Sequence, residues 1–348
     1  MAKIRVGIIG AGGISRGVHI PSWKKIKEAE IIALADVDGT RAAEVAKEHG
    51  IPKSFTDFRE LVKEDIDVVD VCTPNRVHTP AVLAALEAGK HVICEKPLAV
   101  TTDEVRQMGK LADRKKLKLM TAQHMRYTLS SVAIKKWAET GALGEVYHAR
   151  VRAFRRAFLP CSPGFIQDKF SGGGPCMDIG VHALDACMFA MGFPKPVRVT
   201  GVAKTIFAKG HTIPGMWGEW DRKSFDVEDF ASGFVHFDNG ATMVIEAAWL
   251  SHQEEKEDFS YQLFGTGAGV QWPSAKFSTV TNGIFADGKL FNAKSEVNAH
   301  FEEIQAFQQA VTNDLPSPVP WQETIKVIGI LEAIYQSSKT KQEIKIKL

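Results

Sequence analysis

Three polar side chains stand at short intervals near the middle of the sequence. Asp178, His182 and Asp185 are spaced four and three residues apart, and they follow the glycines at 172–174. Residues at these separations lie on one helix face, so a carboxylate there can orient the imidazole of His182 and raise its basicity. Such a histidine can accept a proton from a substrate hydroxyl. A core histidine satisfied by an acidic partner is the alternative, and the spacing alone does not decide between them.

Lys96 is a second candidate for chemistry. It stands in Cys94-Glu95-Lys96-Pro97 at the end of an apolar run, and the proline restricts the local backbone. An ammonium group so placed can donate to a substrate hydroxyl and stabilise a developing alkoxide. A solvated surface lysine is the alternative, and position alone leaves both open.

A glycine loop follows the first apolar run, with the sequence Gly10-Ala11-Gly12-Gly13-Ile14-Ser15. Without side chains the backbone can turn sharply, and its N–H groups can approach a pyrophosphate at the start of the next helix. Ser15 stands where the G-x-G-x-x-G pattern has its third glycine, and a small serine still permits close packing of helix on strand. An ordinary tight turn is the alternative for the loop alone.

Asp36 closes the second apolar run and lies 24 residues after Gly12. A carboxylate at this place can accept hydrogen bonds from the adenosine ribose hydroxyls, and it repels a 2′-phosphate. Helix capping is the alternative role, although Asp38 is better placed for it. The glycine loop, the 24-residue spacing and the acidic residue together predict NAD as the cofactor. Arg16 and Arg41 could reach a 2′-phosphate, so use of NADP stays open.

The elements that must position these residues form two patterns. In the first third, short apolar runs at 3–9, 30–35, 67–72, 91–94 and 117–122 alternate with helical stretches at 41–48, 80–87 and 102–114. This alternation predicts βαβ units and a Rossmann domain over residues 1–125. Ligands bind at the carboxyl ends of such strands, which is where Asp36, Thr73 and Lys96 stand.

The remainder of the chain, residues 126–348, reads as an α+β domain that binds substrate. Its strand-like runs at 145–154, 197–206, 230–237, 241–250 and 260–265 are longer and less regular, and a last helix is expected at 322–336. Asp238-Asn239-Gly240 predicts a tight hairpin between two of these runs.

Composition favours a soluble protein that acts on a small molecule. The net charge is +2, and acidic and basic residues are interspersed along the sequence, so no basic patch suited to nucleic acid or a membrane is predicted. The first residues form too short an apolar run for a signal peptide, so we expect a cytoplasmic location. Five cysteines without a Cys-x-x-Cys pair indicate reduced thiols, and no Cys/His set has zinc-ligand spacing, so we expect no metal.

The ordered motifs resemble the Gfo/Idh/MocA superfamily, which includes glucose-fructose oxidoreductase and inositol dehydrogenase. The motifs are the glycine loop, Thr73-Pro74-Asn75 with His78, Glu95-Lys96-Pro97, and Gly-Gly-Gly followed by Asp178-x-Gly180-x-His182-x-x-Asp185. They occur in the family's order over the whole chain. The resemblance implies a Rossmann domain followed by a domain with a large open, mostly antiparallel sheet, which commonly mediates homodimers or homotetramers.

The same resemblance implies roles for individual residues. His182 is implied as the proton acceptor, with Lys96 and Asp178 positioning the substrate and Lys96 also helping to hold the nicotinamide ribose. The residues implied in cofactor binding are Gly10, Gly12, Gly13, Ile14, Asp36, Thr73, Pro74, Asn75, His78, Glu95 and Lys96. Those implied in substrate binding are Lys96, Arg126, Tyr127, Arg155, Asp178, His182 and Trp249. Trp249 aligns with a tyrosine of inositol dehydrogenase-like members, so the substrate does not transfer; a sugar could stack on it, with a buried core position as the alternative.

Three functional hypotheses follow. The first is NAD-dependent hydride transfer between the nicotinamide and a secondary alcohol of a sugar, sugar derivative or cyclitol. The second is a glycoside-cleaving enzyme that uses the same oxidation transiently, with no net redox change. The third is a non-catalytic sugar or nucleotide sensor of the same fold, against which the presence of Lys96, Asp178 and His182 argues.

Overall fold

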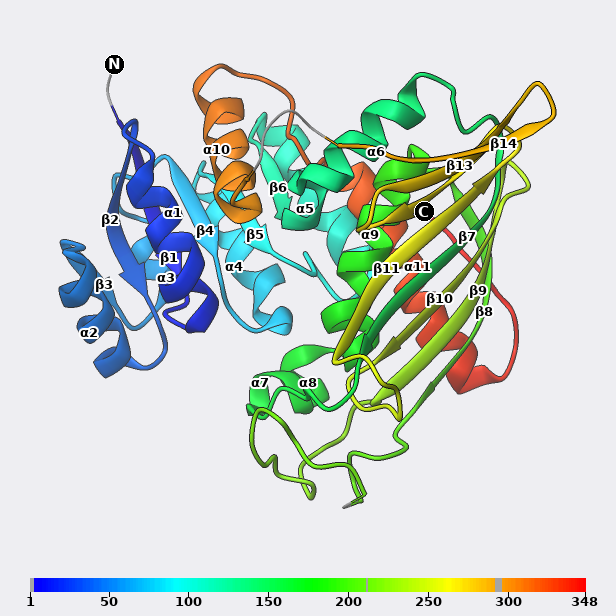
Figure 1. Cartoon of the computed structure of the whole chain (residues 1–348). Coiled ribbons are helices and arrows are strands. Elements are labelled where there is room, and N and C mark those ends of the chain that lie inside the picture. The colour runs from blue at the N-terminus through cyan, green and yellow to red at the C-terminus, as the bar shows by residue number, and fades with distance from the viewer. Residues whose placement is uncertain (1–2, 211, 292–295) are drawn as a thin grey trace. The chain divides into compact units, whose positions relative to one another are not determined.

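The computed structural model describes residues 3–210, 212–291 and 296–348, and the chain divides into two compact units (Figure 1). Unit 1 runs to His124 and also takes in Asn298–Ile325, while unit 2 comprises the other residues. The sequence analysis assigns residues 298–325 to the second domain, and the structure corrects this. Helix α10 (Ala299–Thr312) contacts α1 and β6 of unit 1, a long-range packing that local patterns do not reveal.

Unit 1 is built on a six-stranded parallel sheet in the order β3-β2-β1-β4-β5-β6, which is the Rossmann order. Most of these strands are buried along their length, which explains their continuous apolar sequences. The Rossmann prediction is confirmed, while the short polar strand β3 was not predicted. The strands are β1 (Ile4–Ile9), β2 (Ala29–Ala35), β3 (Lys53–Phe55), β4 (Val68–Val71), β5 (His91–Glu95) and β6 (Leu119–Ala122).

The helices of unit 1 begin at recognisable caps. Asp38 accepts the N–H of Arg41 at 3.1 Å and starts α2, as expected, while Thr101 and Glu104 form a capping box at α5. After the glycine loop the chain forms a π-helical turn, η1 (Ser15–His19), rather than an α-helix. The helices are α1 (Ile20–Lys25), α2 (Gly39–His49), α3 (Phe58–Leu61), α4 (Asn75–Glu87), α5 (Thr102–Lys115), α10 and the first turn of α11 (Trp321–Thr340).

Unit 2 is built on a nine-stranded sheet in the order β14-β13-β12-β11-β7-β10-β9-β8-β15. Only β7 and β10 pair in parallel among its described neighbours, so the sheet is mostly antiparallel, as expected. The predicted hairpin joins β9 to β10. The strands are β7 (Val146–Arg155), β8 (Pro196–Lys204), β9 (Phe230–Phe237), β10 (Thr242–Ala248), β11 (Glu257–Gly265), β12 (Ala268–Trp272), β13 (Lys276–Thr281), β14 (Ile284–Lys289) and β15 (Ile344–Lys345).

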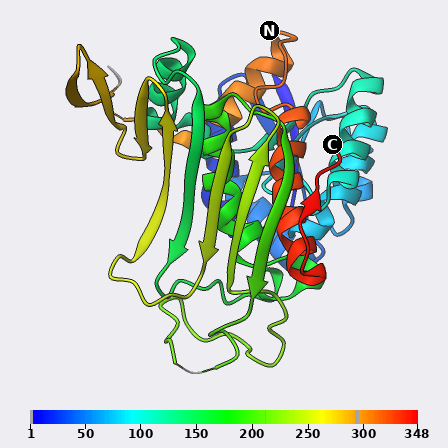
Figure 2. The same ribbon diagram turned by 90° about the vertical axis from the view of Figure 1, so that its right-hand side faces the viewer.

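Helices cover one face of this sheet. A Cβ on Gly201 or Gly233 would come within 2.9 Å or 2.7 Å of Ile334, so glycine lets α11 lie directly on the strands. Figure 2 faces the other side of the sheet. Phe234, which follows Gly233 on β9 and so points away from α11, is 39% exposed. Assembly into a homodimer or homotetramer through that side stays a prediction. The helices of unit 2 are η2 (His124–Tyr127), α6 (Leu129–Glu139), α7 (Pro163–Ile166), α8 (Asp168–Ser171), η3 (Cys176–Gly180), α9 (Val181–Met191) and the remainder of α11. Only the first residue of η2, His124, belongs to unit 1.

Within residues 3–210, 212–291 and 296–348, no helix has the length and apolar character that crossing a membrane requires.

Candidate active site

The glycine loop forms an open cradle at the end of β1. Gly10 has a φ of +103°, and a Cβ there would lie 2.4 Å from the carbonyl oxygen of Cys72, so only glycine fits beside β4. A Cβ on Gly12 or Gly13 would meet nothing within 4 Å, so the backbone of these residues borders open space. Ile14, next along the loop, is 37% exposed. Backbone N–H groups before a helical turn, with room in front of them, fit the pyrophosphate of a dinucleotide.

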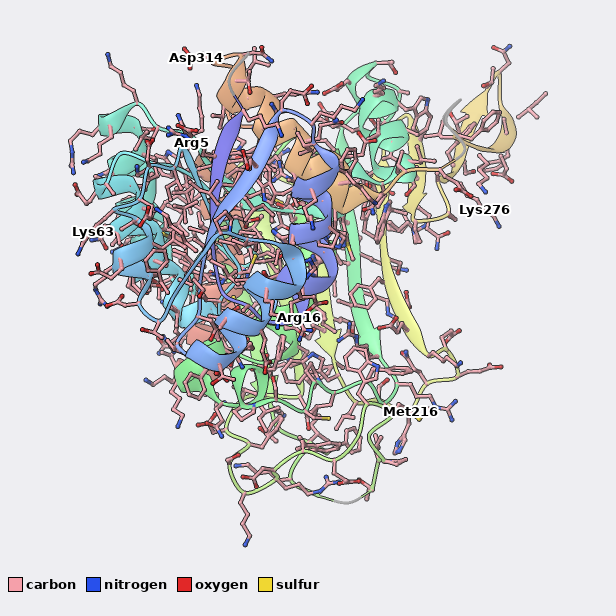
Figure 3. The ribbon with its side chains drawn as sticks, turned by 90° about the vertical axis from the view of Figure 1, so that its left-hand side faces the viewer. Arg5, Arg16, Lys63, Met216, Lys276 and Asp314 are labelled. Atoms are coloured by element: carbon pink, nitrogen blue, oxygen red, sulfur yellow. The ribbon has the colours of Figure 1, made fainter. Side chains whose placement is uncertain are left out.

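Asp36 stands beside this cradle. Its carboxylate accepts the N–H of Ala11 at 2.8 Å and a guanidinium N–H of Arg41 at 2.6 Å. Partial burial opposes ionisation, but these hydrogen bonds lower the pKa of Asp36 below its usual value. The two arginines that left NADP open are both paired with acids, Arg41 with Asp36 and Arg16 with Glu48 at 3.0 Å (Figure 3 labels Arg16). The arrangement suits a ribose hydroxyl better than a phosphate.

Replacing Asp36 by alanine is expected to reduce the preference for NADH over NADPH by at least about tenfold. The change removes the carboxylate that repels a 2′-phosphate and releases the guanidinium of Arg41 to bind one. Dissociation constants from nucleotide fluorescence measure this without a substrate. Asp38→Ala is the matched control, because it removes the helix cap and leaves Asp36 in place. An unaltered preference in Asp36→Ala would show that this carboxylate does not select the cofactor.

His78 fixes the loops that follow β4 and β5. Its buried ring lies between two carbonyl oxygens, with Nδ1 2.7 Å from Pro97 O and Nε2 2.8 Å from Thr73 O. This position makes His78 a support for both loops. Thr73 and Asn75 are half-buried and Pro74 is exposed at the start of α4. Their contact with the cofactor stays a prediction.

A buried chain of charged groups leads to Lys96. The ring of His19 lies between two carboxylates, with Nδ1 2.8 Å from Asp70 Oδ2 and Nε2 2.8 Å from Glu95 Oε1. Trp23 donates its indole N–H to the same oxygen of Asp70 at 2.7 Å. The second oxygen of Glu95 accepts the backbone N–H of Lys96 at 3.0 Å. Glu95 therefore fixes the backbone of Lys96 through this hydrogen bond.

Among the described residues of unit 1, two clusters have donor atoms that could hold a cation. One is the set His19, Asp70 and Cys72, in which Asp70 already bonds the ring of His19 and accepts the thiol of Cys72 at 3.5 Å. The other is the set His124, His300 and Glu303, where the two rings stack at 3.9 Å. Burial and the neighbouring His300 lower the pKa of His124 to about 3, and burial raises the pKa of Glu303 to about 7. Near neutral pH His124 is therefore uncharged.

In unit 2, Asp178 is held by neighbours from the sheet. Its Oδ2 accepts the indole N–H of Trp249 at 3.1 Å and lies 4.0 Å from a guanidinium nitrogen of Arg155. The predicted helix is present, but the α-helical spacing assumed for it is wrong in its first part, because residues 176–180 form the π-helical turn η3 before α9. A π-turn is wider than an α-turn, so the spacing argument for Asp178 and His182 does not apply to it unchanged. His182 is half-buried in the first turn of α9.

Glu228 explains the last glycine of the run before η3, Gly174. Its carboxylate accepts the N–H groups of Gly174 at 2.8 Å and Cys176 at 3.1 Å, and the hydroxyl of Tyr335 at 2.8 Å. A Cβ on Gly174 would lie 2.0 Å from the Glu228 carbonyl oxygen, so the close approach requires glycine. Glu228 thus fixes the segment that carries Asp178.

Some predicted substrate residues have other partners. The buried guanidinium of Arg126 donates to both oxygens of Asp185 at 2.7 Å, so this acid is engaged with Arg126. Trp249 is fully buried and offers no exposed face on which a sugar could stack; it positions Asp178 instead. Tyr127 is half-buried in η2. Substrate contact by Arg126 and Tyr127 stays a prediction.

The fold and the cradle define an oxidoreductase with an NAD-binding Rossmann domain. Residues 4–123 match the model of the oxidoreductase family with an NAD-binding Rossmann fold, and residues 131–271 match the GFO/IDH/MocA C-terminal domain. A D-glucoside 3-dehydrogenase of Escherichia coli (strain K12) is 32% identical over 97% of this chain and 96% of its own length. The chain belongs to the Gfo/Idh/MocA family, which confirms the resemblance and favours an enzyme over a sensor.

Other similar proteins share the fold or much of the sequence. A 1,5-anhydro-D-fructose reductase of Ensifer adhaerens is 33% identical over 75% of this chain and 73% of its own. The crystal structure of an NAD binding oxidoreductase from Klebsiella pneumoniae superposes with a TM-score of 0.84 at 24% identity, covering both chains fully. A levoglucosan dehydrogenase in complex with NADH and levoglucosan gives 0.85 at 23% identity over 99% and 100% of the two chains. At these identities the structures confirm the fold alone.

Proposed function

We propose that this enzyme is an NAD-dependent oxidoreductase that acts on a secondary alcohol of a sugar, sugar derivative or cyclitol. The observation that carries the proposal is the position of Lys96 in the parallel sheet. Gly10, Thr73 and Lys96 follow the adjacent strands β1, β4 and β5, so all three stand at one edge of the sheet. This is the edge at which a Rossmann sheet binds its nucleotide.

The residues of this chain are proposed to bind and deprotonate the alcohol. His182 accepts the hydroxyl proton, and the ammonium of Lys96 donates to the same oxygen as it gains negative charge. Asp178, held by Trp249, accepts from a neighbouring hydroxyl and so orients the ring. Bound NAD supplies the acceptor for the two electrons and hydrogen that leave the carbon. In the reverse direction the same groups return the proton.

The relatives support a carbohydrate as substrate. The names of those given above refer to a glucoside, an anhydro-sugar ketose and levoglucosan, and a D-apiose dehydrogenase of Paraburkholderia graminis is 29% identical over 72% of this chain. They include both dehydrogenases and a reductase, so the direction differs among them. We therefore propose the carbinol of a ring sugar as the reacting group.

A panel of sugars, glycosides, sugar acids and inositols, assayed with NAD and NADP in parallel, tests the proposal. At least one sugar is expected to give NADH, with kcat/KM higher for NAD than for NADP. Corresponding keto-sugars with NADH test the reverse direction. Absence of turnover in both directions across the panel would contradict the proposal. Analysis of the products also tests the cleavage hypothesis, for which glycoside is consumed without accumulation of NADH.

A further inference from the structure

An exposed tryptophan stands in the loop segment between β8 and β9 of unit 2. Trp217 is 52% exposed, which is unusual for so large an apolar side chain. Hydrogen bonds to the backbone of Met216 and Trp217 hold this part of the loop. The N–H of Met216 donates to Ala157 O at 2.8 Å, and the thiol of Cys161 lies 3.5 Å from Trp217 O. Figure 3 labels Met216 among the loops beyond the strand ends, so the exposed indole belongs to an anchored segment.

Two side chains from the end of β7 and the segment after it support the indole. The ring of Phe158 lies 5.5 Å from it between centroids, and Arg155 places its guanidinium carbon 4.7 Å from the indole centroid. Arg155 itself is fixed, because it donates to Glu257 at 2.8 Å and its side chain is only 15% exposed. The guanidinium therefore packs against the indole, while Trp217 as a whole stays 52% exposed and accessible to a ligand.

The same guanidinium connects the indole to Asp178. A terminal nitrogen of Arg155 lies 4.0 Å from Asp178 Oδ2, so one side chain contacts both groups. Asp178 and Trp217 thus both contact the guanidinium of Arg155. When one ring of a ligand lies at Asp178, a substituent on that ring can contact the indole of Trp217. A second sugar ring is long enough to make this contact.

We propose that Trp217, supported by Phe158 and Arg155, binds the second ring of a glycoside whose first ring is held at Asp178. The C–H face of a pyranose packs on the open indole surface, while the guanidinium supports the indole from the surface that it covers. The inference rests on the proposed function, because it takes Asp178 as the group that binds the reacting ring. It assigns the substrate class as glycosides with a second ring, disaccharides included, in preference to free monosaccharides.

The test compares substrates that share the reacting ring, methyl glucoside and the disaccharide cellobiose, in wild type and Trp217→Ala. The ratio of kcat/KM for the disaccharide to that for the methyl glycoside is expected to fall about tenfold in the variant. Trp217→Phe is expected to restore most of the ratio. Phe285→Ala is the matched control, because Phe285 is an 80% exposed aromatic on the edge strand β14, and its ratio should equal that of wild type.

The outcomes separate this inference from the proposed function. An equal ratio in wild type and Trp217→Ala would overturn the second-ring site while leaving the oxidoreductase proposal intact. If the wild type oxidises no member of the panel, the proposed function fails, and binding is then measured without cofactor by isothermal titration calorimetry, which does not depend on Trp217 as a reporter. Tighter binding of the disaccharide that is lost in Trp217→Ala supports the site. A change of oligomeric state in Trp217→Ala would instead assign the indole to a contact between copies of the chain.

Discussion

Replacement of His19 by alanine is expected to lower the free energy of unfolding by about 3 to 5 kcal/mol. The side chain is fully buried, and each ring nitrogen lies 2.8 Å from a carboxylate, of Asp70 on one side and Glu95 on the other. Only a doubly protonated imidazole can donate to both. Its removal leaves two carboxylates buried near each other without a cation. Urea titration followed by tryptophan fluorescence and circular dichroism measures the loss.

The pH dependence of the same variant gives an independent check. Burial opposes the charged ring, but Asp70 raises the pKa of His19 well above its usual value of 6.5. The stability from His19 is therefore complete below pH 6.5 and is lost as the pH rises through the raised pKa. Burial also opposes ionisation of Glu95, but His19 lowers its pKa to about 2, so that contribution is complete above pH 4.5 and is lost in acid.

Wild type is accordingly expected to lose stability on the alkaline side, and His19→Ala to lack that part of the loss. His148→Ala is the control: it removes a half-buried imidazole that bonds the Thr242 hydroxyl at 2.9 Å, at a cost of about 1 kcal/mol. Equal costs for the two variants, or identical pH profiles for wild type and His19→Ala, would contradict a charged bridge at His19.

The buried bridge could not be found from local patterns, because its members lie far apart in the sequence. Residues 19, 70 and 95 meet only after β4 and β5 pair in the parallel sheet. One signal was present: Asp70 interrupts an otherwise apolar strand, Val-Val-Asp-Val, and a buried acid requires a partner. The glycine turn after β1 and the Asp38 cap were predicted correctly because adjacent residues determine them.

Other departures have the same physical origin. The pairing of Arg126 with Asp185 was not predicted, because it depends on how η2 and α9 pack. Helix α10 was not predicted at all, and its place in unit 1 depends on contacts with elements nearly 300 residues away in the chain. Strand β3 was missed because its three residues are largely exposed and carry little apolar signal. Local periodicity reports burial on one element and cannot report which distant element covers it.

Replacing Lys96 by alanine is expected to lower kcat by about 10² to 10³, with a smaller effect on the affinity for NADH. The ammonium is proposed to act on the reacting oxygen as it gains charge, which affects the transition state more than the bound cofactor. The backbone of Lys96 should keep its place, since Glu95 holds it through the main-chain N–H, at 3.0 Å. Steady-state kinetics on the best sugar of the panel, with NADH binding by fluorescence, measures both quantities.

Two further variants test whether the effect of Lys96→Ala comes from loss of the specific ammonium group, from loss of positive charge or from a general effect of removing a lysine. Lys96→Arg retains a positive charge but has a longer, planar head group, so it should recover binding more than turnover. Lys110→Ala removes an exposed lysine from α5 and should behave as wild type. If Lys96→Ala and Lys110→Ala both kept full turnover, the ammonium of Lys96 would have no role in catalysis. The proposed mechanism would then lose the group that links the nucleotide edge of the sheet to the substrate.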